Sequence, residues 1–199
     1  MERSALPIVD AVVKVGGRVL ADVGAFDVVL ATLSDAAGSC RLLVVPGGGP
    51  FADAVRGVDR QIGLSDTAAH WMAIVAMDQY AEVIAERLVR ASLVEDPREI
   101  GTAICRGGVP ILRPSRWLRA ADPLPHSWDV TSDSIAAWIA GQLGARQLIL
   151  VKPPGVDRPE RAVDAYFAHA LPMGVELTIV PADRLGELRR ALRNGAPSL

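Results

Sequence analysis

Short apolar runs alternate with longer helical patterns along most of this chain. We expect buried strands at residues 12–15, 41–45, 102–105, 109–112, 147–151 and 175–180, with a hairpin or bend at the glycines between the third and fourth runs. We expect helices at residues 24–37, 50–57, 65–91, 116–121, 131–143, 159–170 and 182–193. Strands separated by helices are typical of a mainly parallel sheet that is covered on both faces. The pattern predicts an α/β fold, a three-layer αβα sandwich with a mainly parallel central sheet, in a single domain over residues 1–199.

The composition argues against several classes of function. Half of the 199 residues are hydrophobic, which is enough for a large core, and the net charge is −2. No basic stretch is interleaved with aromatic residues, so we expect no nucleic-acid partner. Cys40 and Cys105 lack metal-site or CxxC spacing, which fits a reducing compartment. No apolar run approaches the ~20 residues of a membrane-spanning helix, and the first residues show no signal-peptide pattern, so we expect a cytoplasmic protein without a membrane partner.

Only two of the 21 basic residues are lysines, and each one ends an apolar run. Lys14 follows two valines and precedes Val15-Gly16-Gly17, and Lys152 precedes Pro153-Pro154-Gly155. A lysine ammonium is a compact point charge that suits a moving phosphate, whereas arginine is a planar fork. Two lysines placed at strand ends by chance are the alternative. The positions otherwise predict an anion site at the carboxyl edge of the sheet.

Three glycine-rich turns follow three of the predicted strands: Gly16-Gly17, Gly47-Gly48-Gly49 and Gly155. In open parallel sheets, ligands bind at the carboxyl ends of the strands. The glycine triplet joins a strand to a helix, so its bare amides are expected to reach an anion at the helix N-terminus. Neither GxxxxGK nor GxGxxG is present, and a requirement for tight turns is the alternative explanation.

Asp133 lies in the first turn of the predicted helix 131–143, where the helix dipole favours a carboxylate. We expect it to hold the ammonium groups of Lys14 and Lys152 in position; a simple helix-terminal charge is the alternative. Two cations, glycine-rich turns and one orienting acid suit phosphoryl transfer, which depends mostly on positioning and charge neutralisation. These three residues are therefore the predicted catalytic group. No metal ligands are predicted, and His70 is expected in the core or at an interface.

The longest predicted helix covers residues 65–91 and contains no internal glycine or proline. At ~1.5 Å per residue it would be about 40 Å long, which is more than a domain of this size needs. Two apolar stripes widen its hydrophobic surface. The pattern predicts a homodimer that uses this helix, and a single central core helix is the alternative.

The order Lys-x-Gly-Gly, strand-GGG-helix, Thr-Ser-Asp-x-x-Ala-Ala and strand-x-x-Gly-Val resembles the amino acid kinase superfamily over about residues 11–185. The resemblance implies ATP as the phosphate donor, with Mg²⁺ carried by the nucleotide. It implies that Lys14 touches the transferring phosphate while Asp133 organises the lysines. It also implies that Gly16 and Gly17 contact the nucleotide phosphates and that Gly47, Gly48 and Gly49 contact the acceptor. The stretch 151–156, including Val151 and Gly155, is implied to open the nucleotide pocket.

Three longer strings, VVPGGGPFADAVR, AAHWMAIVAMDQYA and DPLPHSWDVTSDSIAAWIA, are similar to the aminomethyl-furanyl-methyl phosphate kinase branch of that superfamily. That branch phosphorylates an existing phosphate to a diphosphate in the synthesis of methanofuran-type one-carbon cofactors, and methylofuran is the related bacterial compound. The resemblance implies a substrate ammonium facing Asp53 or Asp129 and a phosphate near Arg56. Trp128 is expected beside a small cyclic acceptor, with loop packing as the alternative. Asp53 stands where isopentenyl phosphate kinases have a histidine.

These observations lead to an ATP-dependent kinase of a small phosphomonoester as the preferred interpretation. Two alternatives stay open: a carboxylate or nucleoside monophosphate kinase of the same fold, and a nucleotide- or oxyanion-binding relative without catalysis. Phosphate transfer from ATP across a panel of acceptors separates the three.

Overall fold

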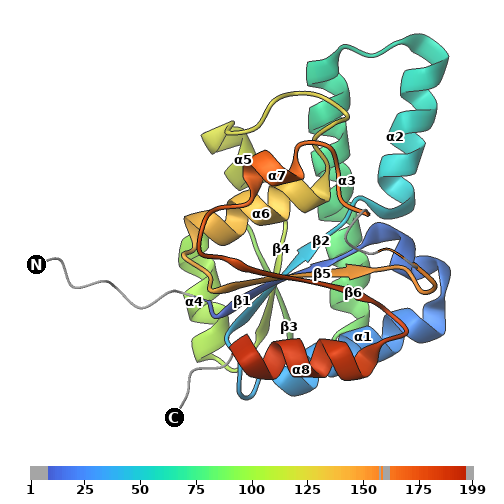
Figure 1. Ribbon diagram of the computed structural model, residues 1–199. Helices are drawn as coiled ribbons and strands as arrows, with labels where there is room; N and C mark the ends of the chain where they lie inside the picture. The colour runs from blue at the N-terminus through green and yellow to red at the C-terminus, as the bar shows by residue number, and fades with distance from the viewer. Residues whose placement is uncertain (1–8, 157, 159–161, 196–199) are drawn as a thin grey trace, which may run out of the picture.

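A parallel sheet forms the centre of the protein (Figure 1). The computed structural model describes residues 9–156, 158 and 162–195. Within these residues the sheet has six strands in the order β3-β4-β2-β1-β5-β6, and every neighbouring pair is parallel. The strands are β1 (Ala11–Val15), β2 (Leu42–Pro46), β3 (Ala91–Val94), β4 (Val109–Leu112), β5 (Gln147–Lys152) and β6 (Glu176–Pro181). The predicted fold class is confirmed.

Helices cover both faces of this sheet. They are η1 (Gly17–Ala21), α1 (Val23–Ala36), α2 (Gly49–Ile62), α3 (Asp66–Arg87), α4 (Pro97–Cys105), α5 (Ser115–Ala121), α6 (Ser132–Gln142), α7 (Phe167–Ala170) and α8 (Leu185–Gly195). One hydrophobic core joins the sheet to α1, α8 and the second half of α3, and another joins it to α4, α5, α6 and α7. Figure 1 shows α2 and α3 as a hairpin that extends beyond the sheet.

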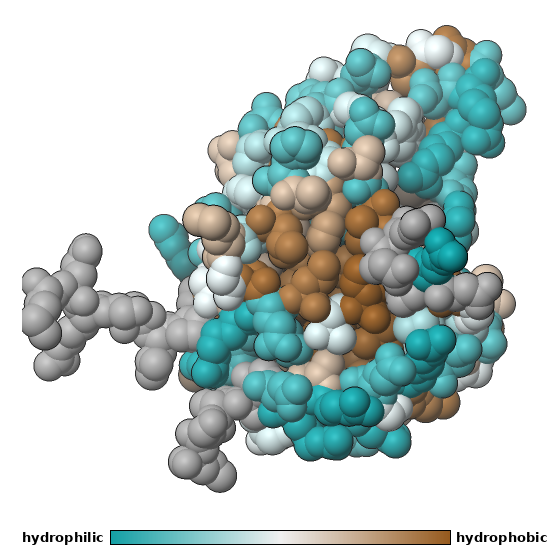
Figure 2. Space-filling view, in the orientation of Figure 1, coloured by the Kyte–Doolittle hydropathy of each residue, from teal (hydrophilic) through white to brown (hydrophobic). Residues whose placement is uncertain are grey.

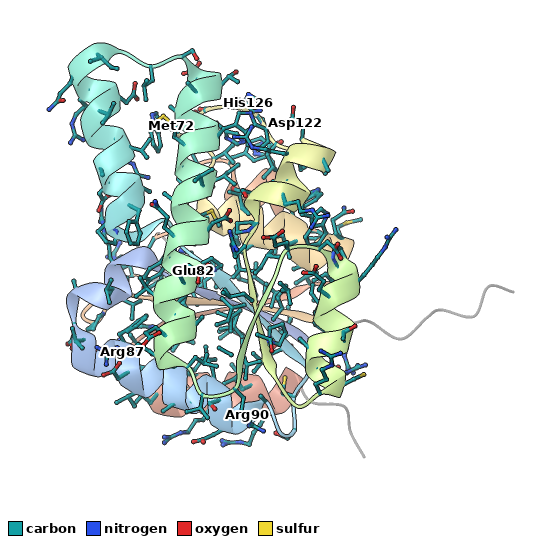
Figure 3. The ribbon with its side chains drawn as sticks, turned by 180° about the vertical axis from the view of Figure 1, so that it is seen from behind. Met72, Glu82, Arg87, Arg90, Asp122 and His126 are labelled. Atoms are coloured by element: carbon teal, nitrogen blue, oxygen red, sulfur yellow. The ribbon has the colours of Figure 1, made fainter. Side chains whose placement is uncertain are left out.

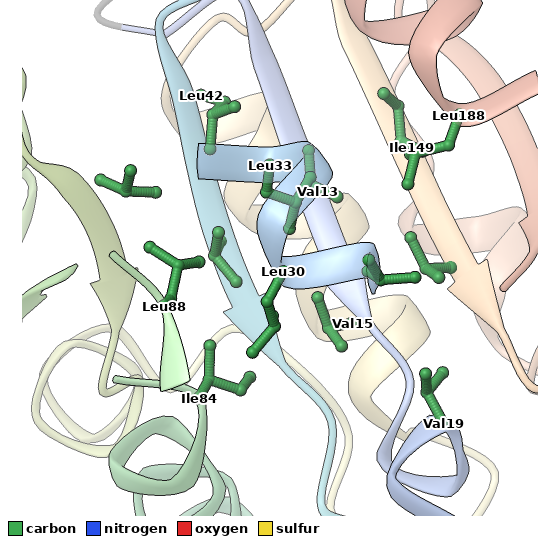
Figure 4. Close-up of a cluster of buried hydrophobic side chains, with 14 of the residues drawn as sticks. Val13, Val15, Val19, Leu30, Leu33, Leu42, Ile84, Leu88, Ile149 and Leu188 are labelled. Atoms are coloured by element: carbon green, nitrogen blue, oxygen red, sulfur yellow. The ribbon is translucent and has the colours of Figure 1, made fainter. Parts of the chain in front are cut away.

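Alternate side chains of the central strands face opposite cores. Val13 and Val15 of β1 pack with Leu30 of α1 in one core (Figure 4), whereas Val12 faces the other core with Ile139 of α6. Strands β1, β2 and β5 are buried along their whole length, which explains why they read as continuous apolar runs. Because each buried valine or leucine contributes about 1.5–3 kcal/mol, these strands hold the carboxyl edge of the sheet firmly in place.

A buried ion cluster ties down the opposite, amino end of the sheet. Asp10 is fully buried and its Oδ1 accepts hydrogen bonds from Nη2 of Arg41 and Nη2 of Arg146, both at 2.7 Å. Burial alone would raise the pKa of Asp10, but the hydrogen bonds from the two arginines hold it below its ordinary value of 3.8. Arg41 precedes β2 and Arg146 precedes β5, so the cluster fixes the starts of three adjacent strands.

The strand predicted at residues 102–105, with its hairpin, is wrong. These residues form the end of helix α4, which begins at Pro97 and is capped by Asp96, whose side chain accepts a hydrogen bond from the amide of Arg98. The partner strand of β4 is instead β3, and the two are parallel. The sequence interpretation missed β3: the helix predicted at 65–91 ends earlier, at Arg87, and the chain turns at Arg90, where φ is +61°, before β3 begins at Ala91. An Asp-Pro pair before an amphipathic run was the helix-start signal that the prediction missed.

Two other predicted helices differ in extent. The helix predicted at 50–57 continues to Ile62 and ends at Gly63, which has the left-handed φ of +67° typical of a helix C-terminus. The helix predicted at 159–170 is wrong in its described part, since residues 162–166 are not helical and only Phe167–Ala170 forms a helical turn. Residues 159–161 lie outside the described residues. The side chain of Asp164 accepts hydrogen bonds from the amides of Thr131 and Ser134, which join this segment to the start of α6.

The edge strand β6 leaves apolar side chains near the surface. Figure 2 shows hydrophobic residues gathered over the middle of the face seen in Figure 1, where β6 lies between α7 and α8. Leu177 and Ile179 of β6 are partly buried there. Among the helices that the structure describes, none is both long and apolar enough to cross a membrane.

Candidate active site

Lys14 and Lys152 lie at the carboxyl edge of the sheet, as predicted. They sit near the ends of β1 and β5, which are adjacent parallel strands, and only 4% and 5% of their surfaces are exposed. Both line a pocket of about 310 Å³, which is within the size range of small-molecule sites. The glycine turns, α2, α3, the start of α6 and the segment after β5 form the other walls of the pocket.

One buried carboxylate joins the two lysines. Lys14 Nζ lies 2.9 Å from Asp133 Oδ1, in an ion pair without hydrogen-bond alignment, and Lys152 Nζ donates to Asp133 Oδ2 at 2.7 Å. Asp133 lies in the first turn of α6 and is 4% exposed. Lys152 also donates to the carbonyl of Ala162. The structure thus brings the three predicted catalytic residues into one cluster with a net positive charge.

Their protonation follows from this mutual contact. Burial alone would raise the pKa of Asp133, but the ammonium groups of Lys14 and Lys152 outweigh it and hold the pKa below 3.8. Burial and repulsion from Lys14 lower the pKa of Lys152 from its ordinary value of 10.5, although Asp133 opposes this shift. Asp133 is therefore ionised at neutral pH. The second lysine gives the cluster positive charge that an incoming anion can neutralise.

The glycine turns pack against each other too closely for side chains. A Cβ on Gly17 would lie only 2.1 Å from the amide nitrogen of Gly49, and one on Gly47 would lie 2.5 Å from the amide nitrogen of Gly17. Gly49 also has a φ of +57°, in the left-handed region that favours glycine. Close packing of the two turns therefore requires glycine here, whatever the turns bind.

Tyr80 of α3 contacts both glycine turns, at Gly16 and at Gly49. Its hydroxyl donates to the carbonyl of Gly16 at 3.4 Å, and its ring lies against Gly49. Gly48 is the N-cap of α2, and both Gly48 and Gly49 line the pocket, so the N-terminus of this helix opens onto the site. Helix N-termini with free amides stabilise anions. The turns are thus suited to hold phosphate groups beside the lysines.

A polar group on α2 forms the outer side of the pocket. Arg56 donates to Asp53 at 3.0 Å, and its guanidinium carbon lies 4.7 Å from the centre of the Trp128 ring. Trp128 Nε1 donates in turn to Asp59 at 2.7 Å. The cation–π contact and this hydrogen bond hold the indole in place. Trp128 packs against a small apolar cluster and also lines the pocket, and its expected place beside a cyclic acceptor stays a prediction.

The pocket brings together most, but not all, of the predicted site residues. Those that line it are Lys14, Gly16, Gly17, Gly48, Gly49, Asp53, Arg56, Trp128, Asp133 and Lys152. The predicted residues outside its lining are Gly47, Asp129, Val151 and Gly155. Gly47 and Val151 support the turns through backbone contacts, since Gly47 N donates to the carbonyl of Val15 and the carbonyl of Val151 accepts from Gly16 N. Asp129 is exposed, and the Gly155 amide donates to Asp183 at 3.3 Å.

His70 is buried, as expected, but it also lines the pocket, which the sequence interpretation missed. Its ring stacks on His126 with centroids 4.3 Å apart, and His126 also contacts Asp122 at 2.9 Å (Figure 3). Burial, with a smaller effect of His126, lowers the pKa of His70 to about 4. His70 is therefore neutral at physiological pH. The available signal was the position of His70 four residues after Asp66, because residues at this spacing share one face of a helix.

Other residues of the site were also missed. Arg18 and Asp66 line the pocket, and Asp66 forms no ion pair among the described residues. Asp164 lies behind the start of α6 and accepts hydrogen bonds from Thr131 and Ser134. In the part of the chain that the structure describes, no group of three His, Cys, Asp or Glu side chains could hold a metal ion.

Part of this chain is similar in sequence to a curated protein. The 113 residues that match the [5-(aminomethyl)furan-3-yl]methyl phosphate kinase of Methanocaldococcus jannaschii are 36% identical to it. This match covers 55% of the present chain and 50% of the relative, so the chain spans about half the length of that curated relative.

Solved structures show the same fold at low sequence identity. Uridylate kinase from Archaeoglobus fulgidus has a TM-score of 0.67 and 17% identity, with 94% of this chain and 96% of that chain covered. UMP kinase from Ureaplasma parvum also has a TM-score of 0.67, with 16% identity and coverage of 87% and 90%. Aspartate kinase from Synechocystis has a TM-score of 0.61 and 14% identity, covering 86% of this chain and 38% of that chain. Residues 11–156 match the amino acid kinase family, and the chain belongs to that family.

Proposed function

We propose that this protein is an ATP-dependent kinase that phosphorylates a small phosphomonoester to a diphosphate. The observation that carries the proposal is the buried Lys14–Asp133–Lys152 cluster beside two glycine turns. Such a cluster supplies fixed positive charge, and phosphoryl transfer depends mainly on positioning and charge neutralisation. The family match and the kinase relative support the same class of reaction.

The charges on the pocket wall favour a doubly anionic pair of substrates. Four cationic side chains line the pocket, and three carboxylates oppose them: Lys14, Arg18, Arg56 and Lys152 against Asp53, Asp66 and Asp133. A nucleotide tail and an acceptor phosphate together carry more negative charge than a nucleotide and a carboxylate. Mg²⁺ bound to the nucleotide phosphates would neutralise part of it.

A phosphate acceptor needs no general base, and among the described residues the carboxylate next to the lysines, Asp133, is already paired with both of them. A phosphomonoester oxygen is already ionised at neutral pH, because its second pKa is about 6. This oxygen would attack the terminal phosphorus of ATP, the bond from that phosphorus to its bridging oxygen would break, and ADP would leave with the electron pair. We propose that Lys14 lies at the transferring group, that Lys152 lies on the nucleotide side, and that Gly48 and Gly49 hold the acceptor phosphate.

For the acceptor we propose aminomethyl-furanyl-methyl phosphate, the compound in the printed name of the curated relative, in a methanofuran- or methylofuran-type pathway. Its ammonium needs a carboxylate at the end of the pocket away from the lysines. Asp53 and Asp66 line the pocket, whereas Asp129 does not, so we rank Asp129 below them. Asp53 is already paired with Arg56. Asp66 is therefore our first choice for the ammonium contact, with Asp53 second.

An acceptor panel tests the proposal. ATP consumption would be measured with the aminomethyl compound, its deaminated analogue, UMP, isopentenyl phosphate, aspartate and acetylglutamate. Losing one charge-assisted contact costs about 1.5–3 kcal/mol, so the deaminated analogue should bind roughly 10- to 150-fold more weakly. Asp66→Asn should remove this preference, and Asp129→Asn is the matched control. Turnover of carboxylates alone would refute the phosphate acceptor, and equal use of both furans would refute the ammonium contact.

We also propose that the protein forms a homodimer through α3. Met72, which Figure 3 labels on this helix, and Val75 are 39% and 41% exposed, and both line a surface pocket together with Trp71. Met77 lies in the second apolar stripe of the helix pattern and was expected at the interface, but it is only 2% exposed and lines the active-site pocket. The interface is therefore proposed on the Met72 side of the helix.

A further inference from the structure

A single carboxylate outside the catalytic cluster holds the helix that carries Asp133. Asp164 Oδ2 accepts hydrogen bonds from the Thr131 amide at 3.0 Å, the Thr131 hydroxyl at 2.8 Å and the Ser134 amide at 3.0 Å. Its Oδ1 accepts from the hydroxyl of Ser134. Thr131 is the N-cap of α6, yet its own side chain makes no capping bond. The cap of α6 is therefore supplied by Asp164, which lies 33 positions after Thr131 in the segment that follows β5.

The same segment reaches the catalytic cluster at a second point. Two residues before Asp164, the carbonyl of Ala162 accepts a hydrogen bond from Lys152 Nζ. On its other side, the amide of Phe167 donates to the carbonyl of Asp164, and Phe167 is buried in the core. Residues 162–167 thus join a core anchor, the α6 cap and the Lys152 ammonium in one short stretch. Displacing Asp164 would move both partners of the Asp133–Lys152 pair.

We propose that Asp164 is a positioning residue for phosphoryl transfer. By capping α6, Asp164 fixes the position of Asp133, and Asp133 in turn fixes the separation of the two lysines. This inference rests on the proposed kinase function. Asp164 itself does not line the pocket, so its effect passes through Asp133 and Lys152. Its negative charge also helps to keep Lys152 protonated. The local sequence offered no signal, because the cap and the helix are distant in the chain.

The chain contains a matched control for this cap. Asp78 of α3 accepts hydrogen bonds from the amide and the hydroxyl of Ser115, at the start of α5. It therefore caps a helix from a distant element with the same chemistry. No residue of α5 lines the pocket. Asp78→Ala should reproduce the loss of stability that follows from removing a cap, without the loss of catalytic geometry.

The first test measures backbone amide exchange without substrates. In Asp164→Ala, amides of residues 131–135 should exchange roughly 5- to 30-fold faster than in the wild type, as expected for the loss of a strong cap. Asp78→Ala should leave these amides unchanged and affect the start of α5 instead. Unchanged exchange at residues 131–135 in Asp164→Ala would overturn the inference.

The second test measures initial rates with ATP and the best acceptor of the panel. A small misplacement of catalytic groups costs up to about 100-fold in rate, so kcat of Asp164→Ala should fall roughly 10- to 100-fold while KM for ATP changes little. Asp164→Asn keeps an oxygen for the two amides and should recover most of the lost rate. A kcat equal to that of Asp78→Ala, or no recovery with asparagine, would refute the positioning role. A wild type that is inactive with every acceptor would refute the proposed function, and the substrate-free exchange comparison would still decide whether Asp164 holds the start of α6.

Discussion

Removing Lys14 should separate catalysis from stability more cleanly than any other change in the site. If Lys14 has its proposed role, the transferring phosphate would lose a buried, preorganised cation in Lys14→Ala. Losing such a group costs roughly 3–4 kcal/mol in the transition state, so kcat should fall about 100- to 1000-fold. The assay is ADP release at saturating ATP and acceptor. Arg60→Ala, which removes an equal charge from an exposed position on α2 outside the pocket, is the control and should leave kcat unchanged.

The same substitution should change stability little, because it leaves no unpaired charge in the cluster. Breaking a buried ion pair is costly, about 3–5 kcal/mol, when it leaves an unpaired charge. In Lys14→Ala, Asp133 keeps Lys152 at 2.7 Å, and the cluster becomes neutral. The lost side chain also borders a pocket, so no closed cavity forms. The melting temperature should therefore stay within a few degrees of the wild type.

Asp133→Ala provides the opposite case within the same cluster. It leaves the buried ammonium groups of Lys14 and Lys152 without their shared carboxylate, so urea unfolding should show a loss of about 3–5 kcal/mol together with the loss of turnover. The reasoning fails if Lys14→Ala retains near wild-type turnover. It also fails if Lys14→Ala is as unstable as Asp133→Ala.

Three further predictions follow from other parts of the structure. Gly17→Ala should abolish turnover, because its Cβ would meet the backbone of the facing turn at 2.1 Å. The control is Gly57→Ala in α2, where the added Cβ meets open space; it should retain activity and add about 1 kcal/mol of stability in chemical unfolding. The pKa of Asp10 is lowered in the folded protein, so its contribution to the unfolding free energy should be complete above its ordinary value of 3.8 and decrease as the pH falls below it. Asp10→Asn should flatten this acid limb in urea titrations at several pH values, and an unchanged slope would contradict the assignment. Val75→Glu should give a monomer in light scattering, whereas Val28→Glu, which replaces a valine of α1 with the same 41% exposure, should not; a monomeric wild type would end the dimer proposal.

Patterns that depend on neighbouring residues were sufficient for strands β1, β2, β4, β5 and β6 and for the residues at the centre of the site, but not for β3. The runs that end at Lys14 and Lys152 are buried on both faces, so their hydrophobicity is continuous and predicts parallel strands. Parallel strands bring their carboxyl ends to one edge, which places both lysines together. Asp133 was predictable because a carboxylate in the first turn of a helix is a local feature.

Contacts between distant segments determined the rest of the structure. The helix predicted at 65–91 runs past the true end of α3 at Arg87, and the short strand β3 that follows was missed because only its parallel pairing with β4 defines it. Met77 and Met72 belong to the same apolar surface in sequence, yet packing against the sheet buries one and leaves the other exposed. The sequence offered Asp53 and Asp129 as carboxylates for a substrate ammonium and missed Asp66, which only the path of α3 places on the pocket wall.

The sequence by itself determined the kind of fold and the charges available at one edge of its sheet, because strand burial, helix starts and glycine turns depend on near neighbours in the chain. The tertiary structure decided which of those charges meet and what holds them there. Asp164 shows the difference most clearly, since it caps the helix of Asp133 from a segment beyond β5. No local pattern marks such a contact, because the free energy that stabilises it arises only when the two segments pack together.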